Sequence, residues 1–127
     1  MISKSISLGE AELEIMKVLW RAGEAVNSQY ISDAVEDRGW KRTTILTFLT
    51  RLADKGAVYA EKRGKQYYYT PIISQKEYSK SQTKNLISSL FNGSVKDFAL
   101  SLFENEAMSD EDINELRAVF DDKEGLL

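Results

Sequence analysis

The sequence predicts a mainly α-helical chain with one small β-hairpin, and two observations carry this prediction. Residues 41–54 place large apolar side chains at spacings of three and four, which puts them on one face of a helix: Ile45, Phe48, Leu49 and Leu52. Residues 57–62 and 65–70 are rich in β-branched and aromatic residues, and Arg63-Gly64 between them supplies the glycine of a tight turn. A helix followed at once by such a hairpin is typical of a winged helix-turn-helix.

Two further helices are expected before residue 41. Ser7 to Glu10 has the form of a capping box, so a first helix should begin there and end at Gly23. Asn27 or Ser28 then caps a second helix, which Gly39 terminates. The turn that follows has the length that joins the two helices of a helix-turn-helix at a steep angle.

The side of the third helix opposite its apolar face carries short hydroxyl groups. Thr43, Thr44 and Thr47 lie near its N-terminal end, where helix-turn-helix proteins reach base edges, and Leu46 lies on the flank. Threonines are mediocre helix formers, which favours contact with DNA over a role as solvent-facing filler. Leu46 either packs on the flank of the domain or contacts a thymine methyl group. We predict that these four residues contact bases.

Charge is distributed unevenly along the chain. Residues 38–65 hold eight cations and two anions, residues 81–127 hold four cations and ten anions, and the whole chain carries a formal charge of −3. Cations concentrated on one helix and one hairpin tip indicate a surface that meets phosphates. Arg51 has the alternative of a salt bridge to Asp54 or to a carboxylate of the second helix. The predicted contacts to the DNA backbone are Asn27, Ser28, Lys41, Arg42, Arg51, Lys62, Arg63 and Lys65.

Beyond Pro71 the pattern contains helices only. They are predicted over residues 77–91, from Ser94 onward, and from Ser109 onward with Asp112 in the capping-box position. Their apolar stripes have no sheet on which to lie, and such stripes are most easily buried against a second copy of the same chain. The predicted interface residues of this homodimer are Leu86, Leu90, Phe91, Val95, Phe98, Ala99, Leu102, Phe103, Ile113, Leu116 and Phe120.

The chain is therefore expected to contain two domains. Residues 1–73 form a winged helix-turn-helix DNA-binding domain, and residues 74–127 form a three-helix dimerisation domain. A two-fold dimer also relates two recognition helices by symmetry, which is how helix-turn-helix proteins read palindromic half-sites.

Composition excludes several classes of function. Cysteine and histidine are absent, which removes disulfides, thiolate metal sites, the commonest general base and the commonest transition-metal ligand. We therefore expect no enzyme activity, no metal and no cofactor. No apolar run is long enough to span a bilayer and no export signal is present, so we expect a cytoplasmic protein without membrane contact.

Several stretches of the chain resemble the penicillinase-repressor family, the winged-helix repressors of β-lactamase, methicillin-resistance and copper-transport operons. They are AELEIMKVLW in the first helix, GWKRTTILTFLTRLADKGAV across the third, and KNLISSLFNGSVKDFALSLF followed by SDEDINELR in the tail. The resemblance implies a homodimeric, sequence-specific transcriptional repressor that binds a palindromic operator in double-stranded DNA. The alternative is a winged helix that serves only protein-protein contacts, and loss of salt-sensitive DNA binding would favour it.

The chain departs from the family pattern at three places. The β-lactam-responsive members are cleaved at an Asn-Phe bond, whereas the aligned pair here is Ser101-Leu102, so the resemblance does not extend to proteolytic induction or to a particular upstream signalling protein or protease. Copper-responsive members carry a cysteine-rich motif, which this chain lacks, so copper release is excluded. Many members have Ser-Pro-Lys at residues 41–43 and a long polar side chain in place of Leu46, so the operator sequence does not carry over.

Overall fold

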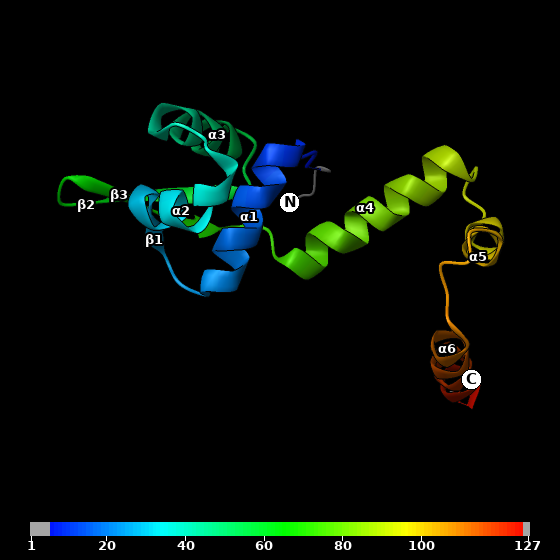
Figure 1. The fold of residues 1–127 in the computed structure, drawn as a ribbon. Helices are drawn as coiled ribbons and strands as arrows, with labels where there is room; N and C mark the ends of the chain where they lie inside the picture. Colours follow the sequence, from blue (N-terminus) through cyan, green and yellow to red (C-terminus); the bar gives the residue numbers. More distant parts are fainter. Residues whose placement is uncertain (1–5, 126–127) are drawn as a thin grey trace. The chain divides into compact units, whose positions relative to one another are not determined.

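The computed structural model of the chain describes residues 6–125, with side chains described as far as residue 122 (Figure 1). The ends of the two predicted domains, residues 1–5 and 126–127, lie outside the described residues. The chain divides into two compact units, the first ending at Ser81 and the second beginning at Gln82.

The described part of the first unit begins with three helices and three strands. In order they are α1 (Glu10–Ala22), β1 (Val26–Asn27), α2 (Ser28–Ala34), a 3₁₀ turn (Glu36–Arg38), α3 (Arg42–Asp54), β2 (Val58–Arg63) and β3 (Gln66–Pro71). The predicted winged helix-turn-helix is confirmed, and β1 adds a short third strand to the expected hairpin.

The core of the first unit is built around the predicted apolar face of α3. Ile45, Leu49 and Leu52 are at most 1% exposed and belong to one cluster with the buried side chains of α1, α2 and the sheet. Phe48 lies at the rim of this core and is only partly buried, with its ring edge-on to Trp40 at 5.3 Å. This burial fixes which side of α3 remains exposed to solvent.

Helix α1 begins later than the sequence pattern predicts. Gly9 is its N-cap, and the Gly9 amide donates a hydrogen bond to the Glu12 carboxylate at 2.8 Å. The expected capping box of Ser7 and Glu10 is therefore wrong. Glu12 is 5% exposed and also accepts a hydrogen bond from Lys55, which ties the start of α1 to the end of α3. Burial raises the pKa of Glu12, but the hydrogen bonds from Lys55 and Gly9 outweigh it and hold the pKa below its ordinary value.

The segment from α2 to α3 confirms the predicted N-cap of α2 but not its predicted end. Helix α2 ends at Ala34, with Val35 as its C-cap, and Gly39 ends the 3₁₀ turn instead. Asn27 caps α2, because its side-chain oxygen accepts a hydrogen bond from the Tyr30 amide at 2.9 Å. After the 3₁₀ turn, Gly39 takes a left-handed conformation with φ of 68°, which suits a residue without Cβ. Helix α3 follows, with Lys41 as its N-cap residue. These caps orient α3 against α1 and α2.

The sheet has the strand order β1-β3-β2 with antiparallel pairing throughout. Arg63 pairs with Gln66, so the two turn residues of the hairpin are Gly64 and Lys65, one position later than predicted. Gly64 has φ of 65°, which matches the first central position of a type II′ turn. The two-residue loop fixes the register of the hairpin, and therefore which side chains point to each face.

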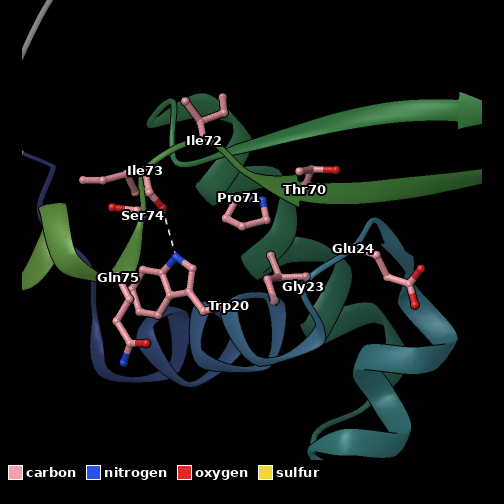
Figure 2. A pocket seen from close by; sticks show the side chains of 10 residues that line it. Trp20, Gly23, Glu24, Thr70, Pro71, Ile72, Ile73, Ser74 and Gln75 are labelled. Carbon is pink, nitrogen blue, oxygen red and sulfur yellow. Dashed lines mark hydrogen bonds between the residues drawn. The ribbon is translucent and has the colours of Figure 1, made fainter.

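The segment that follows β3 is anchored to α1. Figure 2 shows the Trp20 indole N–H donating a hydrogen bond to the Ile73 carbonyl, at 2.9 Å, beside a hollow of about 390 Å³. Tyr78, in helix α4 (Gln75–Leu90), is 8% exposed, and its ring centroid lies 6.1 Å from that of Trp20. The first turns of α4 therefore lie within the first unit, whereas the predicted domain limit is residue 73.

The tail consists of α4, α5 (Val95–Glu104) and α6 (Asp110–Gly125). Helix α4 begins two residues earlier than predicted, because Ser74 and Glu77 exchange capping hydrogen bonds at 3.0 Å. The predicted starts of α5 and α6 are confirmed. The Ser94 hydroxyl caps α5, and Ser109 and Asp112 form the expected capping box of α6.

Candidate nucleic-acid interface

The predicted base-contacting residues lie together on the side of α3 that faces away from the core. Thr43 and Thr47 are exposed, Thr44 is half-buried, and Leu46 is 37% exposed. The β2–β3 hairpin projects past the helices of the first unit (Figure 1). One helix face and one projecting hairpin therefore carry the predicted DNA-contacting residues, apart from Asn27 and Ser28.

The hydroxyl groups on this face are partly used inside the helix. Thr47 donates a hydrogen bond to the Thr43 carbonyl at 3.0 Å, and Thr50 donates to the Leu46 carbonyl at the same distance. Such bonds fix the rotamer and leave the threonine methyl group and the oxygen lone pairs for other partners. Together with Leu46, this face suits the methyl group of thymine and the amino groups of adenine or cytosine in a major groove.

The cations of α3 lie at both ends of this face. Lys41, Arg42 and Arg51 are all exposed. Arg42 donates to the Gln29 side chain at 3.3 Å and to the Ser28 hydroxyl at 3.5 Å, so it bridges α3 to the first turn of α2. Within residues 6–122, Arg51 forms no ion pair, and the alternative of a salt bridge to a neighbouring carboxylate does not occur there.

The wing, which is β2, β3 and the turn between them, carries the other predicted cations. Lys62, Arg63 and Lys65 are all exposed. Arg63 pairs with Glu61 at 2.9 Å, and its guanidinium carbon lies 4.8 Å from the centre of the Tyr68 ring. Neither lysine forms an ion pair in the part of the chain that the structure describes. The cations of the wing are therefore not equivalent.

Asn27 and Ser28 lie where α2 meets the rest of the site. The Asn27 amide group donates a hydrogen bond to the Gln66 side chain at 2.7 Å, while the Asn27 oxygen caps α2. Ser28 contacts Arg42, as described above. Asn27 thus connects α2 to the wing, and Ser28 connects α2 to α3.

Three residues of this surface do not stand out in the local sequence pattern. Gln29 and Gln66 each bond to a predicted backbone-contacting residue from a distant segment, and no local spacing indicates such a bond. Tyr67 is 50% exposed on the wing. Alternation along β3 was a usable signal for it, because Tyr67 and the buried Tyr69 must share a face.

The described part of the chain was also compared with the requirements of a metal site and of a membrane span. Among the described residues, no group of three or more acidic side chains is placed to hold a metal ion. None of the helices described here is long and apolar enough to cross a membrane. What this surface offers is positive charge, hydroxyl groups and one exposed leucine.

The second unit leaves the predicted dimer residues accessible. None of residues 82–122 is buried. Phe91, Phe98, Leu102 and Ile113 are half-buried, and the rings of Phe91 and Phe98 meet edge-on at 5.6 Å. A hollow of about 340 Å³ lies between α5 and α6. The exposed members of the predicted set are Leu86, Leu90, Val95, Ala99, Phe103, Leu116 and Phe120.

Comparison with known proteins gives full-length relatives. The penicillinase repressor of Bacillus licheniformis is 31% identical over 121 residues, which cover 95% of this chain and 94% of that protein. The methicillin resistance regulatory protein MecI of Staphylococcus aureus strain N315 is 28% identical over 123 residues, which cover 97% of this chain and all of that protein.

Solved structures show the same winged-helix fold. The DNA-binding domain of the repressor BlaI is 35% identical with a TM-score of 0.53, over 61% of this chain and 94% of that one. The monomeric form of Bacillus licheniformis BlaI in complex with the blaP half-operator is also 35% identical, with a TM-score of 0.51 and the same coverage. The model of the penicillinase repressor family matches residues 8–122. The chain therefore belongs to the penicillinase repressor family.

Proposed function

We propose that this protein is a transcriptional repressor that binds double-stranded DNA as a homodimer and reads a two-fold symmetric operator. The observation that carries the proposal is the exposed face of α3, where hydroxyl and methyl groups lie between exposed cations. The major groove is wide enough to admit an α-helix with such a face. Family membership supports the proposal, since the related BlaI is solved in complex with a half-operator.

The sequence of the operator is read by Thr43, Thr44, Leu46 and Thr47. Single hydroxyl and methyl contacts are weaker than the bidentate contact of an arginine with guanine, so selectivity is built from several modest contacts. Exposure of Thr43, Leu46 and Thr47 supports this assignment. The half-buried Thr44 contributes less surface than the other three.

Affinity is supplied by contacts with the DNA backbone. Lys41, Arg42 and Arg51 flank the reading face of α3, and the wing carries three further cations, Lys62, Arg63 and Lys65. Asn27 and Ser28 take part at the start of α2, where they also hold the wing and α3 in place. Each phosphate that a cation neutralises adds about 0.9 to the slope of log affinity against log salt.

The second unit provides the homodimer. A single chain leaves large apolar side chains of α4, α5 and α6 exposed to water. A second copy of the same chain can cover them, because it is present wherever the protein is made. A two-fold axis makes the same apolar patch self-complementary and presents two α3 helices to two half-sites. Exposure of Leu90, Val95 and Phe120 by 65% or more supports this assignment.

Selection of bound fragments from random DNA, followed by footprinting, tests the proposal. We expect one enriched motif with dyad symmetry, protected on two half-sites about one helical turn apart or a multiple of it. Recovery of unrelated fragments without a shared motif would contradict sequence-specific repression. Absence of salt-sensitive DNA binding would instead favour a winged helix that serves only protein-protein contacts.

Replacement of Leu46 by arginine tests which face of α3 enters the groove. The added cation should raise affinity for random DNA slightly, while preference at one position of each half-site changes by about 1 to 3 kcal/mol, toward guanine. Repeating the selection with the variant measures both effects. An unchanged motif with uniformly higher affinity would show that Leu46 does not face the bases.

A further inference from the structure

The hairpin register divides the wing into two faces of different chemistry. Side chains alternate along a strand, and residues directly opposite each other on paired strands share a face. Val58 and Tyr69 are buried in the core, so their face of the sheet is the one on which the helices pack. Lys62 pairs with Tyr67. Lys62 is separated from Val58, and Tyr67 from Tyr69, by an even number of positions, so both lie on that face. We call Lys62 and Tyr67 the inner wing face.

The side chains that alternate with these point to the other face of the sheet. We call this group the outer wing face: Glu61, Arg63, Gln66 and Tyr68. Its polar groups are engaged with one another and with β1. Arg63 donates from Nε and a terminal nitrogen to the same Glu61 oxygen, at 3.0 and 2.9 Å, and stacks on the Tyr68 ring. Gln66 accepts a hydrogen bond from Asn27. The outer wing face therefore has no net charge, and its arginine is already paired.

The inner wing face has the opposite character. Lys62 is exposed and has no ion-pair partner among the described residues, and Tyr67 directly opposite is 50% exposed. An ammonium group and a phenolic hydroxyl on neighbouring strands are both hydrogen-bond donors, about 5 Å apart at their Cβ atoms in such a pair. Two adjacent donors with one positive charge suit a phosphate oxygen.

We propose that Lys62 and Tyr67, on the inner wing face, contact the DNA phosphates. Arg63 stays paired with Glu61 and Tyr68 on the outer wing face and does not contact the DNA. The inference rests on the proposed function and divides the cations of the wing by role. A phosphate that approached Arg63 would meet the Glu61 carboxylate beside it, and Arg63 would have to leave both of its partners. Lys62 meets a phosphate without losing an ion pair. Tyr67 becomes a DNA-contacting residue that charge alone does not indicate.

Salt dependence of binding separates the two faces in the full-length chain. The probe is a fluorescent mixed-sequence DNA duplex, titrated with protein between about 50 and 200 mM salt. Lys62→Gln removes one unpaired cation, whereas the double variant Glu61→Gln with Arg63→Gln removes the pair and leaves the net charge unchanged. We expect Lys62→Gln to flatten the slope by about 0.9 for each bound protomer, and the double variant to leave it unchanged.

A matched pair of tyrosines tests the hydroxyl. Tyr67→Phe should weaken binding by about 2- to 10-fold, the range for one lost hydrogen bond, with no change of slope. Tyr59→Phe is the control. Tyr59 is similarly exposed, by 58%, but points to the same side of the sheet as the outer wing face. Equal losses for both tyrosines would overturn the role of Tyr67.

The outcomes also separate this inference from the function on which it rests. A flattened slope in the double variant, or an unchanged slope in Lys62→Gln, would overturn the assignment of faces while the wild-type chain still binds DNA. A wild-type chain that does not bind the duplex at all would overturn the proposed function, and this inference with it.

Discussion

The two compact units treat large apolar side chains in opposite ways. In the first unit, Ile15 and Leu19 have no exposed surface. In the second, Leu90, Val95 and Phe120 are 69%, 65% and 68% exposed. Burial of a large apolar side chain is worth about 1.5 to 3 kcal/mol, so the second unit leaves much of its own stabilisation unrealised in a single chain.

The contrast in burial indicates which unit depends on a partner. Three helices and a sheet close one core in the first unit, where the buried carboxylate of Glu12 is paired with Lys55. Helices α5 and α6 bury no residue among those described. We therefore expect the first unit to fold alone and the second to be stabilised by association.

The largest expected effect comes from charge in the apolar stripe of α5. Replacing Phe98 and Leu102 together by aspartate should convert the proposed dimer to a monomer at tens of micromolar protein, because burying an unpaired charge in an apolar interface costs several kcal/mol. Analytical ultracentrifugation measures the change. Lys96→Asp on the same helix is the control and should leave the dimer intact. A double variant that sediments like the wild type would show that α5 is not in the interface.

A smaller effect is expected where the first unit ends. A fragment of residues 1–81 keeps Tyr78 against Trp20, whereas a fragment of residues 1–73 loses it. The shorter fragment should be less stable by about 2 to 4 kcal/mol, from the burial of one large side chain and one aromatic pair. Chemical denaturation measures the difference, and Tyr78→Ala in the longer fragment should reproduce most of it. Equal stability of the two fragments would place the limit of this unit at residue 73.

The smallest effect concerns the charged link between α1 and α3. Glu12→Gln should lower the free energy of unfolding by about 1 to 3 kcal/mol at pH 7, because it removes a charged partner of Lys55. The pKa of Glu12 is lowered in the folded chain, so this stabilisation is present above the unfolded value of about 4.5 and is lost as pH falls through the folded value. Urea denaturation at pH 7 and below pH 4 should therefore show the deficit of the variant shrinking in acid.

Glu14 provides the matched control for this prediction. It lies on the same helix and pairs with Lys17 and Arg38, but its side chain is 29% exposed. Glu14→Gln should therefore cost clearly less than Glu12→Gln, because exposed ion pairs contribute little. A Glu12 deficit that persists unchanged in acid would show that packing, and not charge, is responsible.

Local periodicity was sufficient to predict the fold of the first unit, but it did not predict the contacts between residues far apart in the sequence. The apolar stripe of α3 follows from spacing alone. The start of α1 does not, because the N-cap Gly9 has no side chain that marks it in the sequence, and Glu12 is held by Lys55, 43 positions away. The anchoring of Trp20 to Ile73, 53 positions away, is equally invisible to a local pattern.

The candidate site shows the same division. Exposure of Thr43, Leu46 and Thr47 follows from the apolar face on the other side of the helix. The chemistry of the wing does not, because Arg63-Gly64 and Gly64-Lys65 both satisfy the local requirement for a turn glycine. The register of β2 against β3 decides which of these two pairs forms the turn. The same register determines which side chains of the two strands share a face.

The two-residue turn at Gly64 and Lys65 thus controls more than the shape of the hairpin. Inserting one residue into β2 between the core and the turn would shift its outer part by one position and exchange its two faces. Glu61 and Arg63 would then point to the side of the helices, and Lys62 to the opposite side. Two hairpins of nearly identical composition would present different charges to a nucleic acid. In this protein, we expect an insertion of that kind to alter affinity for DNA without altering the net charge.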